Sequence, residues 1–117
     1  MQLEREITKE ALVVRASGDL DVRTSPQFRE TVDGWLVGTD RKRLILNLTK
    51  LHFLDSTGLG AILGRLRRAK ELGREMALIP PSGVARTLVD AGALGRVMAV
   101  YRSERLALSE EAQANHG

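Results

Sequence analysis

The chain has 117 residues, which suits a single domain, and its 43% apolar and 28% charged residues are typical of a soluble globular protein. It contains no cysteine, which excludes disulfides and thiolate chemistry, and its two histidines, His52 and His116, are too scattered for a metal site. The net charge of +3 is mild and aromatic residues make up only 3% of the chain, so nucleic acid is not an expected partner. No signal peptide or membrane-spanning run is recognisable, and we expect a cytoplasmic protein that binds no cofactor.

Two strands and a helix are predicted at the start of the chain. Residues 3–8 and 11–17 favour strands, and the short turn between them predicts an antiparallel hairpin. A helix should follow, because Thr24 and Gln27 match a capping box and Pro26 suits a first helical turn. Its apolar face has helical spacing and consists of Phe28, Val32, Trp35 and Leu36.

The middle of the chain predicts a buried strand and a second helix. Residues 44–48 are nearly continuous in apolar residues, which indicates a central strand covered on both faces. After a loop around Asp55 comes a helix whose buried stripe is Leu59, Ile62, Leu63, Leu66 and Ala69. Its basic residues, Arg65, Arg67, Arg68 and Lys70, are interpreted as a solvated face or as a docking surface for an acidic partner.

The remaining elements continue the alternation. Residues 76–79 predict a strand, Ser82 begins a third helix, residues 96–100 predict a last strand, and a short helix starts at Ser103. The order β-β-α-β-α-β-α-β-α predicts an α/β domain with a mixed, largely parallel sheet, an N-terminal hairpin and about four helices. We expect one domain over residues 1–110 and a frayed tail over residues 111–117.

Ser56 is the candidate functional residue. It lies where a buried strand leads through a loop into a helix, a region where sites of such sheets gather. Asp55, Ser56 and Thr57 are all good helix-capping types, while Gly58 and Gly60 leave backbone N–H groups approachable. Locally, this pattern fits either a plain helix cap or a serine that accepts a phosphoryl group, whose charge of about −1.5 to −2 a helix start tolerates.

Two motifs together resemble a known family. The run Asp55-Ser56-Thr57-Gly58-Leu59-Gly60, with Ile62-Leu63-Gly64 behind it and Gly18-Asp19-Leu20-Asp21 upstream, is similar to STAS-domain anti-sigma-factor antagonists over about residues 10–108. The resemblance implies a STAS-like fold and a regulatory protein without catalytic residues. In that family an anti-sigma factor, itself a serine-protein kinase, phosphorylates the serine that matches Ser56.

The resemblance also implies a cycle of binding and release. The unmodified antagonist binds the kinase and frees the sigma factor, the phosphorylated form lets go, and a serine phosphatase restores it. The residues expected to contact the partner are Asp21, Asp55, Ser56, Thr57, Gly58 and Gly60. His52, ahead of Asp55, departs from the family pattern and is expected to be a surface residue.

Other functions remain open. STAS-like domains also serve as accessory subunits of lipid transporters or as scaffold modules of stress-sensing complexes, and a nucleotide could bind at the helix start. A magnesium site from Asp19, Asp21 and Asp55 is not favoured, because the first two suit solvated turn positions. A serine hydrolase is not favoured either, since a Gly-x-Ser-x-Gly elbow is absent. Gly60 and Gly64 either permit close backbone packing or form a shallow exposed groove.

Overall fold

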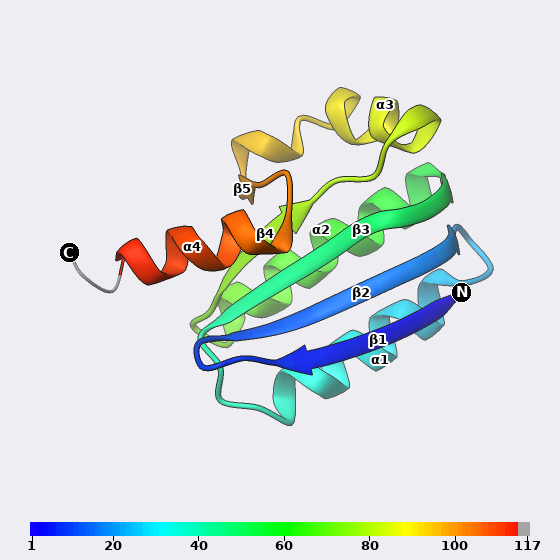
Figure 1. Ribbon diagram of the computed structural model, residues 1–117. Helices are drawn as coiled ribbons and strands as arrows, with labels where there is room; N and C mark the ends of the chain where they lie inside the picture. The colour runs from blue at the N-terminus through cyan, green and yellow to red at the C-terminus, as the bar shows by residue number, and fades with distance from the viewer. Residues whose placement is uncertain (115–117) are drawn as a thin grey trace.

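The computed structural model describes residues 1–114, with side chains placed through Ser109, and contains a five-stranded sheet in the order β1-β2-β3-β4-β5 (Figure 1). β1 is antiparallel to β2, and all other neighbouring strands are parallel. The predicted α/β architecture is thereby confirmed over the described residues. The elements are β1 (Gln2–Ile7), β2 (Ala11–Leu20), α1 (Ser25–Val37), β3 (Arg43–Leu54), α2 (Ser56–Glu71), β4 (Glu75–Ile79), α3 (Gly83–Ala91), a 3-10 turn (Leu94–Arg96), β5 (Ala99–Val100) and α4 (Glu104–Ala114).

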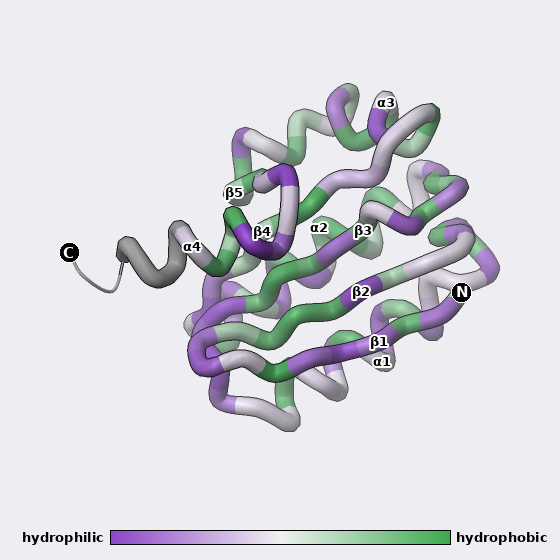
Figure 2. Tube along the Cα trace, in the orientation of Figure 1, coloured by the Kyte–Doolittle hydropathy of each residue, from purple (hydrophilic) through white to green (hydrophobic). Residues whose placement is uncertain are grey.

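The main core lies between the sheet and helices α1 and α2, which cover its rear face in Figure 1. Alternate residues of β2 and β3 point into this core, as the period of a strand requires. Hydrophobic colouring is concentrated in β2, β3 and β4, whereas β1 is mostly polar (Figure 2). Phe28, Val32 and Leu36 of α1 are fully buried, and Trp35 is half-buried beside Arg5.

Both strands that lead to the candidate site are longer than predicted. β2 continues to Leu20 and β3 to Leu54, so residues 49–54 belong to a strand and not to a loop. Register shifts at Arg15/Ser17 and Gly18/Asp19 interrupt the alternation, which hides the strand period in the sequence. Gly18 has φ +96°, a conformation that favours glycine at such an irregularity.

The predicted strand over residues 96–100 is largely wrong. β5 contains only Ala99 and Val100, while Arg96 ends the 3-10 turn. Ala93 has φ 54°, which turns the chain at this point and delays the strand. Helix α4 ends at Ala114, so residues 111–114 of the expected tail are helical, and residues 115–117 lie outside the described part of the chain.

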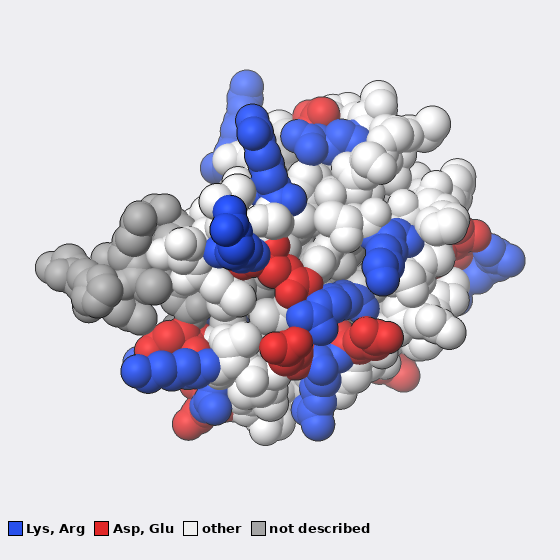
Figure 3. Space-filling view, in the orientation of Figure 1, with Lys and Arg blue, Asp and Glu red and all other residues white. Residues whose placement is uncertain are grey.

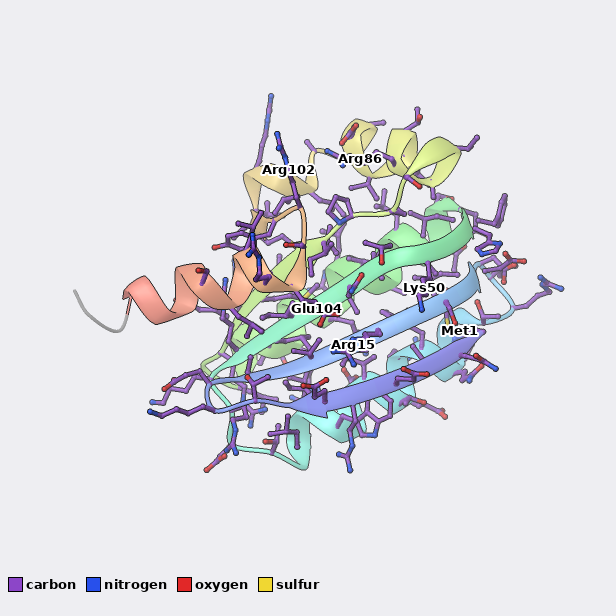
Figure 4. All side chains as sticks on the ribbon, in the orientation of Figure 1. Met1, Arg15, Lys50, Arg86, Arg102 and Glu104 are labelled. Carbon is purple, nitrogen blue, oxygen red and sulfur yellow. The ribbon has the colours of Figure 1, made fainter. Side chains whose placement is uncertain are left out.

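The front face of the sheet is only partly covered. Ile45 is buried beneath Ala107 of α4, as expected for a strand covered on both faces, but Asn47, two residues further on, is polar and half-buried. Glu104, the first residue of α4, forms two hydrogen bonds of 2.8 Å with the guanidinium of Arg15 (Figure 4). It also accepts a 2.6 Å hydrogen bond from the amide of Asn47. These contacts anchor α4 to the sheet.

Acid is expected to loosen α4 through Glu104. Hydrogen bonding to Arg15, then to Asn47, lowers the pKa of Glu104 below its ordinary value of 4.5. A carboxyl whose pKa is lowered by folding stabilises the protein above that ordinary value, and this contribution is lost as the pH falls through the folded-state pKa. Glu104→Gln should cost about 1–2 kcal/mol at neutral pH and flatten the pH dependence below 4.5.

Urea unfolding followed between pH 3 and 7, about the range in which carboxyl groups titrate, measures this effect. Glu6→Gln is the matched control, because Glu6 pairs with the same arginine at 2.8 Å but is exposed. Its effect should be smaller, as for other exposed ion pairs. Equal pH slopes for the wild type and Glu104→Gln would contradict the role of Glu104.

Candidate functional site

Asp55 joins the two loops at the carboxyl ends of β2 and β3. One carboxylate oxygen accepts a 2.8 Å hydrogen bond from the N–H of Gly58 and thereby caps α2. The other accepts a 3.1 Å hydrogen bond from the N–H of Val22, in the loop between β2 and α1. A single half-buried side chain therefore fixes the start of α2 against the neighbouring loop.

Ser56 is the first residue of α2 and is exposed. Because Asp55 supplies the cap, the hydroxyl of Ser56 is not needed for it, and no hydrogen bond of this hydroxyl is found among the described residues. Thr57 is exposed beside it. The first N–H groups of a helix have no partner within the helix and carry partial positive charge. Ser56 is thus an accessible hydroxyl at a positively polarised helix end.

Asp21 is held inside its own loop. Its carboxylate accepts hydrogen bonds from the N–H groups of Arg23 and Thr24, at 2.9 and 3.2 Å, and pairs with the guanidinium of Arg23 at 2.9 Å. The Arg23 guanidinium, aided by both N–H groups, holds the pKa of Asp21 below its usual range. Only 8% of the Asp21 side chain is exposed, so in this conformation it shapes the loop, and direct contact with a partner stays a prediction.

Thr24 has a different role from the predicted capping box. It is the N-cap residue of α1 and Pro26 lies in the first turn, but Thr24 makes no side-chain capping bond. Its hydroxyl instead donates to the carbonyl of Asp19 at 2.8 Å and accepts from the N–H of Asp21 at 3.0 Å. The hydroxyl closes the Asp19–Asp21 turn and is therefore unavailable to the helix.

The glycines of α2 divide into two kinds. Gly58 is buried, and a Cβ atom added to it would lie 2.3 Å from the carbonyl oxygen of Leu20. Glycine is therefore required where the start of α2 approaches the end of β2. An added Cβ at Gly60 or Gly64 would meet nothing within 4 Å. Close packing does not explain these two glycines, which leave a bare strip of helix backbone that is exposed at Gly60 and half-buried at Gly64.

Arg65 does not belong to the basic surface expected on α2. It is buried, donates a 3.0 Å hydrogen bond to the carbonyl of Arg29 and pairs with Asp33 of α1 at 2.6 Å. Burial lowers its pKa, which the charge of Asp33 partly offsets. The periodicity of α2 places position 65 beside α1, and only the three-dimensional arrangement reveals its partner. Arg67 and Lys70 are exposed as expected.

Two exposed apolar side chains at this edge of the sheet were not predicted from the sequence. Val22 and Phe53 are 64% and 49% exposed, although both are apolar. Val22 belongs to the loop that Asp55 contacts, and Phe53 is the penultimate residue of β3, two residues before Asp55. The sequence signal for this apolar surface is Val22 itself, a hydrophobic residue directly after Asp21 in a loop that is expected to be polar.

His52 is exposed on β3, as expected for a surface residue. No group of three histidine, aspartate or glutamate side chains that could hold a metal ion occurs among the described residues. Within residues 1–114, no helix is long and apolar enough to cross a membrane.

The fold and the site define an α/β domain with an accessible serine at the carboxyl edge of its sheet. A family model described as the STAS domain matches residues 2–107, and the chain belongs to this family. The resemblance noted from the two motifs is thereby confirmed.

Several similar proteins are anti-sigma factor antagonists. The chain is 36% identical over 110 residues to the anti-sigma F factor antagonist of Paenibacillus polymyxa, and the match covers 94% of both chains. The solved structure of the anti-sigma factor antagonist SpoIIAA in its unphosphorylated form matches with a TM-score of 0.78 and 27% identity, covering 96% of this chain and 97% of that one. The Bacillus cell fate determinant SpoIIAA in the phosphorylated form matches with a TM-score of 0.70 and 28% identity, covering 93% and 98%.

Proposed function

We propose that this chain is an anti-sigma-factor antagonist controlled by phosphorylation of Ser56. In its unmodified form it binds an anti-sigma factor that is also a serine-protein kinase, and the sigma factor is released. Phosphorylation of Ser56 ends this binding, and a serine phosphatase restores it. The observation that carries the proposal is the exposed hydroxyl of Ser56, which forms no hydrogen bond with the described residues, at a helix start that Asp55 already caps.

The helix start suits a phosphoserine. Transfer of the γ-phosphoryl group of ATP to the hydroxyl oxygen of Ser56 forms a serine phosphate ester, releases ADP and frees the hydroxyl proton. The modified residue then carries about −1.5 to −2 charges beside the positive end of α2, which stabilises negative charge by roughly 0.3–1 kcal/mol. The fold therefore tolerates the phosphate, while the electrostatic potential of the outer surface changes sign.

The surroundings of Ser56 suit a protein partner. Val22 and Phe53 offer exposed apolar side chains at the same edge of the sheet. Gly60 and Gly64 follow Ser56 at intervals of four residues and therefore continue its face of α2 as bare backbone. A partner that excludes water from this surface would bury Ser56 in its neutral form, and a phosphate there would cost several kcal/mol.

Intact-mass analysis tests the assignment of Ser56. The chain is incubated with ATP and each serine-protein kinase of the anti-sigma-factor class from the source organism, alongside the Ser56→Ala and Thr57→Ala variants. The wild type and Thr57→Ala should gain one phosphate, and Ser56→Ala none. Phosphorylation of Ser56→Ala to the same extent would refute the site. Co-purification with a transporter ATPase and with no such kinase would favour the role as an accessory subunit.

The bare strip on α2 gives a prediction in which stability and binding change in opposite directions. Replacing Gly60 and Gly64 by alanine should raise the free energy of unfolding, by up to about 1 kcal/mol per site, because alanine favours helix and neither Cβ meets a neighbour. The same methyl groups should hold a closely packed partner away and weaken binding by about tenfold, or about 1.4 kcal/mol.

Gly34→Ala is the matched control, because Gly34 is an equally open glycine inside α1. It should stabilise the fold and leave partner affinity unchanged. Urea unfolding and isothermal titration with the anti-sigma factor provide the two measurements. If the double alanine variant is stabilised and still binds as well as the wild type, the strip is not part of the interface.

A further inference from the structure

A groove lies between α3 and β5. It has a volume of about 530 Å³ at the end toward Gly83 and Arg102, and a second part of about 230 Å³ continues past Leu94. Pro80, Arg86 and Val100 line both parts, so the two form one continuous depression. Its buried floor is apolar and includes Pro80 and Leu94.

The lining of this groove includes two arginines, Arg86 and Arg102, and one acid, Asp90. Arg86 comes from α3 and Arg102 from the turn after β5, and both line the larger part (Figure 4). Lys and Arg atoms gather over this part of the surface, above β5 and the start of α4 (Figure 3). Arg86 pairs with Asp90 at 2.8 Å, but both side chains are exposed, and such a pair exchanges partners at little cost. No ion pair of Arg102 is found among the residues whose side chains are described.

β5 is the outermost strand of the described sheet on this side, and its residue Val100 lines the groove. The N–H of Tyr101 donates to the carbonyl of Leu78 in β4 at 2.9 Å. Because backbone groups alternate in direction along a strand, the N–H and C=O of Val100 point away from β4. Val100 lines the groove, is 39% exposed, and its backbone forms no hydrogen bond found among the described residues.

We propose that this groove binds an extended acidic peptide segment of a partner protein. The peptide lies beside β5, exchanges backbone hydrogen bonds with Val100 and places carboxylates against Arg86 and Arg102, while its apolar side chains cover Pro80 and Leu94. Strand addition at a sheet edge combines backbone pairing with side-chain pockets in this way. Nucleic acid fits less well, because the aromatic ring of Tyr101 packs against the cluster that contains Ile45 and Ala107 and is not free to stack.

Fluorescence anisotropy with a labelled octapeptide that alternates glutamate and valine tests this proposal. The wild type should bind it, binding should weaken with added salt, and a lysine–valine peptide should not bind. Arg86→Glu with Arg102→Glu should lower the affinity by at least about tenfold. Lys9→Glu with Lys42→Glu makes the same change in net charge at exposed positions next to the amino ends of β2 and β3, and should have no comparable effect.

A second variant tests the backbone contact. Val100→Pro removes an N–H that points away from β4, together with a side chain that lines the groove. Proline is tolerated at such an edge position, so the pairing of β5 with β4 should be retained while peptide binding falls. If Val100→Pro unfolds, the variant with Arg86→Glu and Arg102→Glu still tests whether the groove binds the peptide. The proposal fails if the glutamate–valine peptide does not bind at millimolar concentration, if the arginine variant binds it equally well, or if oligothymidine displaces it and binds more tightly. Ser56→Asp should leave peptide binding unchanged, which separates this test from the switch.

Discussion

Replacing Ser56 by aspartate is expected to weaken binding of the anti-sigma factor by about 100-fold, or about 2.7 kcal/mol. The new carboxylate would lie beside Asp55, where the partner is expected to bury a neutral hydroxyl. Desolvation and like-charge repulsion both oppose the complex. Ser56→Ala should retain the affinity of the wild type, since it adds no charge. Isothermal titration of purified proteins measures the difference.

Stability measurements separate this effect from unfolding. Aspartate at the start of α2 interacts favourably with the helix dipole, so the free energy of unfolding of Ser56→Asp should equal or exceed that of the wild type. Ser109→Asp adds the same charge to an exposed position of α4 and should not change the affinity. If Ser56→Asp binds as tightly as Ser56→Ala, charge at Ser56 does not control the complex.

Gly58→Ala should destabilise the protein by about 3 kcal/mol, as overpacking at rigid sites does. The new methyl group would lie 2.3 Å from the carbonyl oxygen of Leu20 and 2.8 Å from a methyl carbon of Leu54. The first of these atoms belongs to the backbone and has little freedom to move. The start of α2 must shift away from β2, which breaks the bond between Asp55 and Val22 and misplaces Ser56.

Gly60→Ala is the control for Gly58→Ala, because it lies two residues further along the same helix in open space. It should raise the free energy of unfolding where Gly58→Ala lowers it. Urea unfolding gives both values, and backbone NMR shifts of Val22 report whether the loop has moved. A Gly58→Ala variant as stable as the wild type would show that α2 can start further from β2 than the structure indicates.

Helix α2 illustrates which structural features could be predicted from the sequence and which could not. Its apolar spacing predicted the buried Ile62, Leu66 and Ala69 correctly, because one packed face leaves a period of 3.6 residues. The same pattern could not show that the side chain of Arg65 is buried, because its ion-pair partner Asp33 belongs to another helix, α1. β2 and β3 were predicted too short, because irregular register destroys the alternation by which a strand is recognised.

The candidate site was located by its residue types and not by its geometry. Asp55, Ser56 and Gly58 lie at the start of α2, as the motif indicated, but the sequence offered Asp55, Ser56 and Thr57 alike as candidate caps. In the structure Asp55 caps α2, Gly58 permits the close approach of α2 to β2, and the hydroxyl of Ser56 forms no hydrogen bond with the described residues. The bond from Asp55 to Val22 spans 33 residues, a separation that local sequence patterns do not report.

The central claim is that a phosphate on Ser56 releases the partner. The most direct test prepares the chain with one phosphate on Ser56, verified by mass, and titrates it and the unmodified chain against the same anti-sigma factor. The phosphorylated chain should bind at least about 100-fold more weakly, and phosphatase treatment should restore the original affinity. Equal affinity before and after phosphorylation would contradict the account.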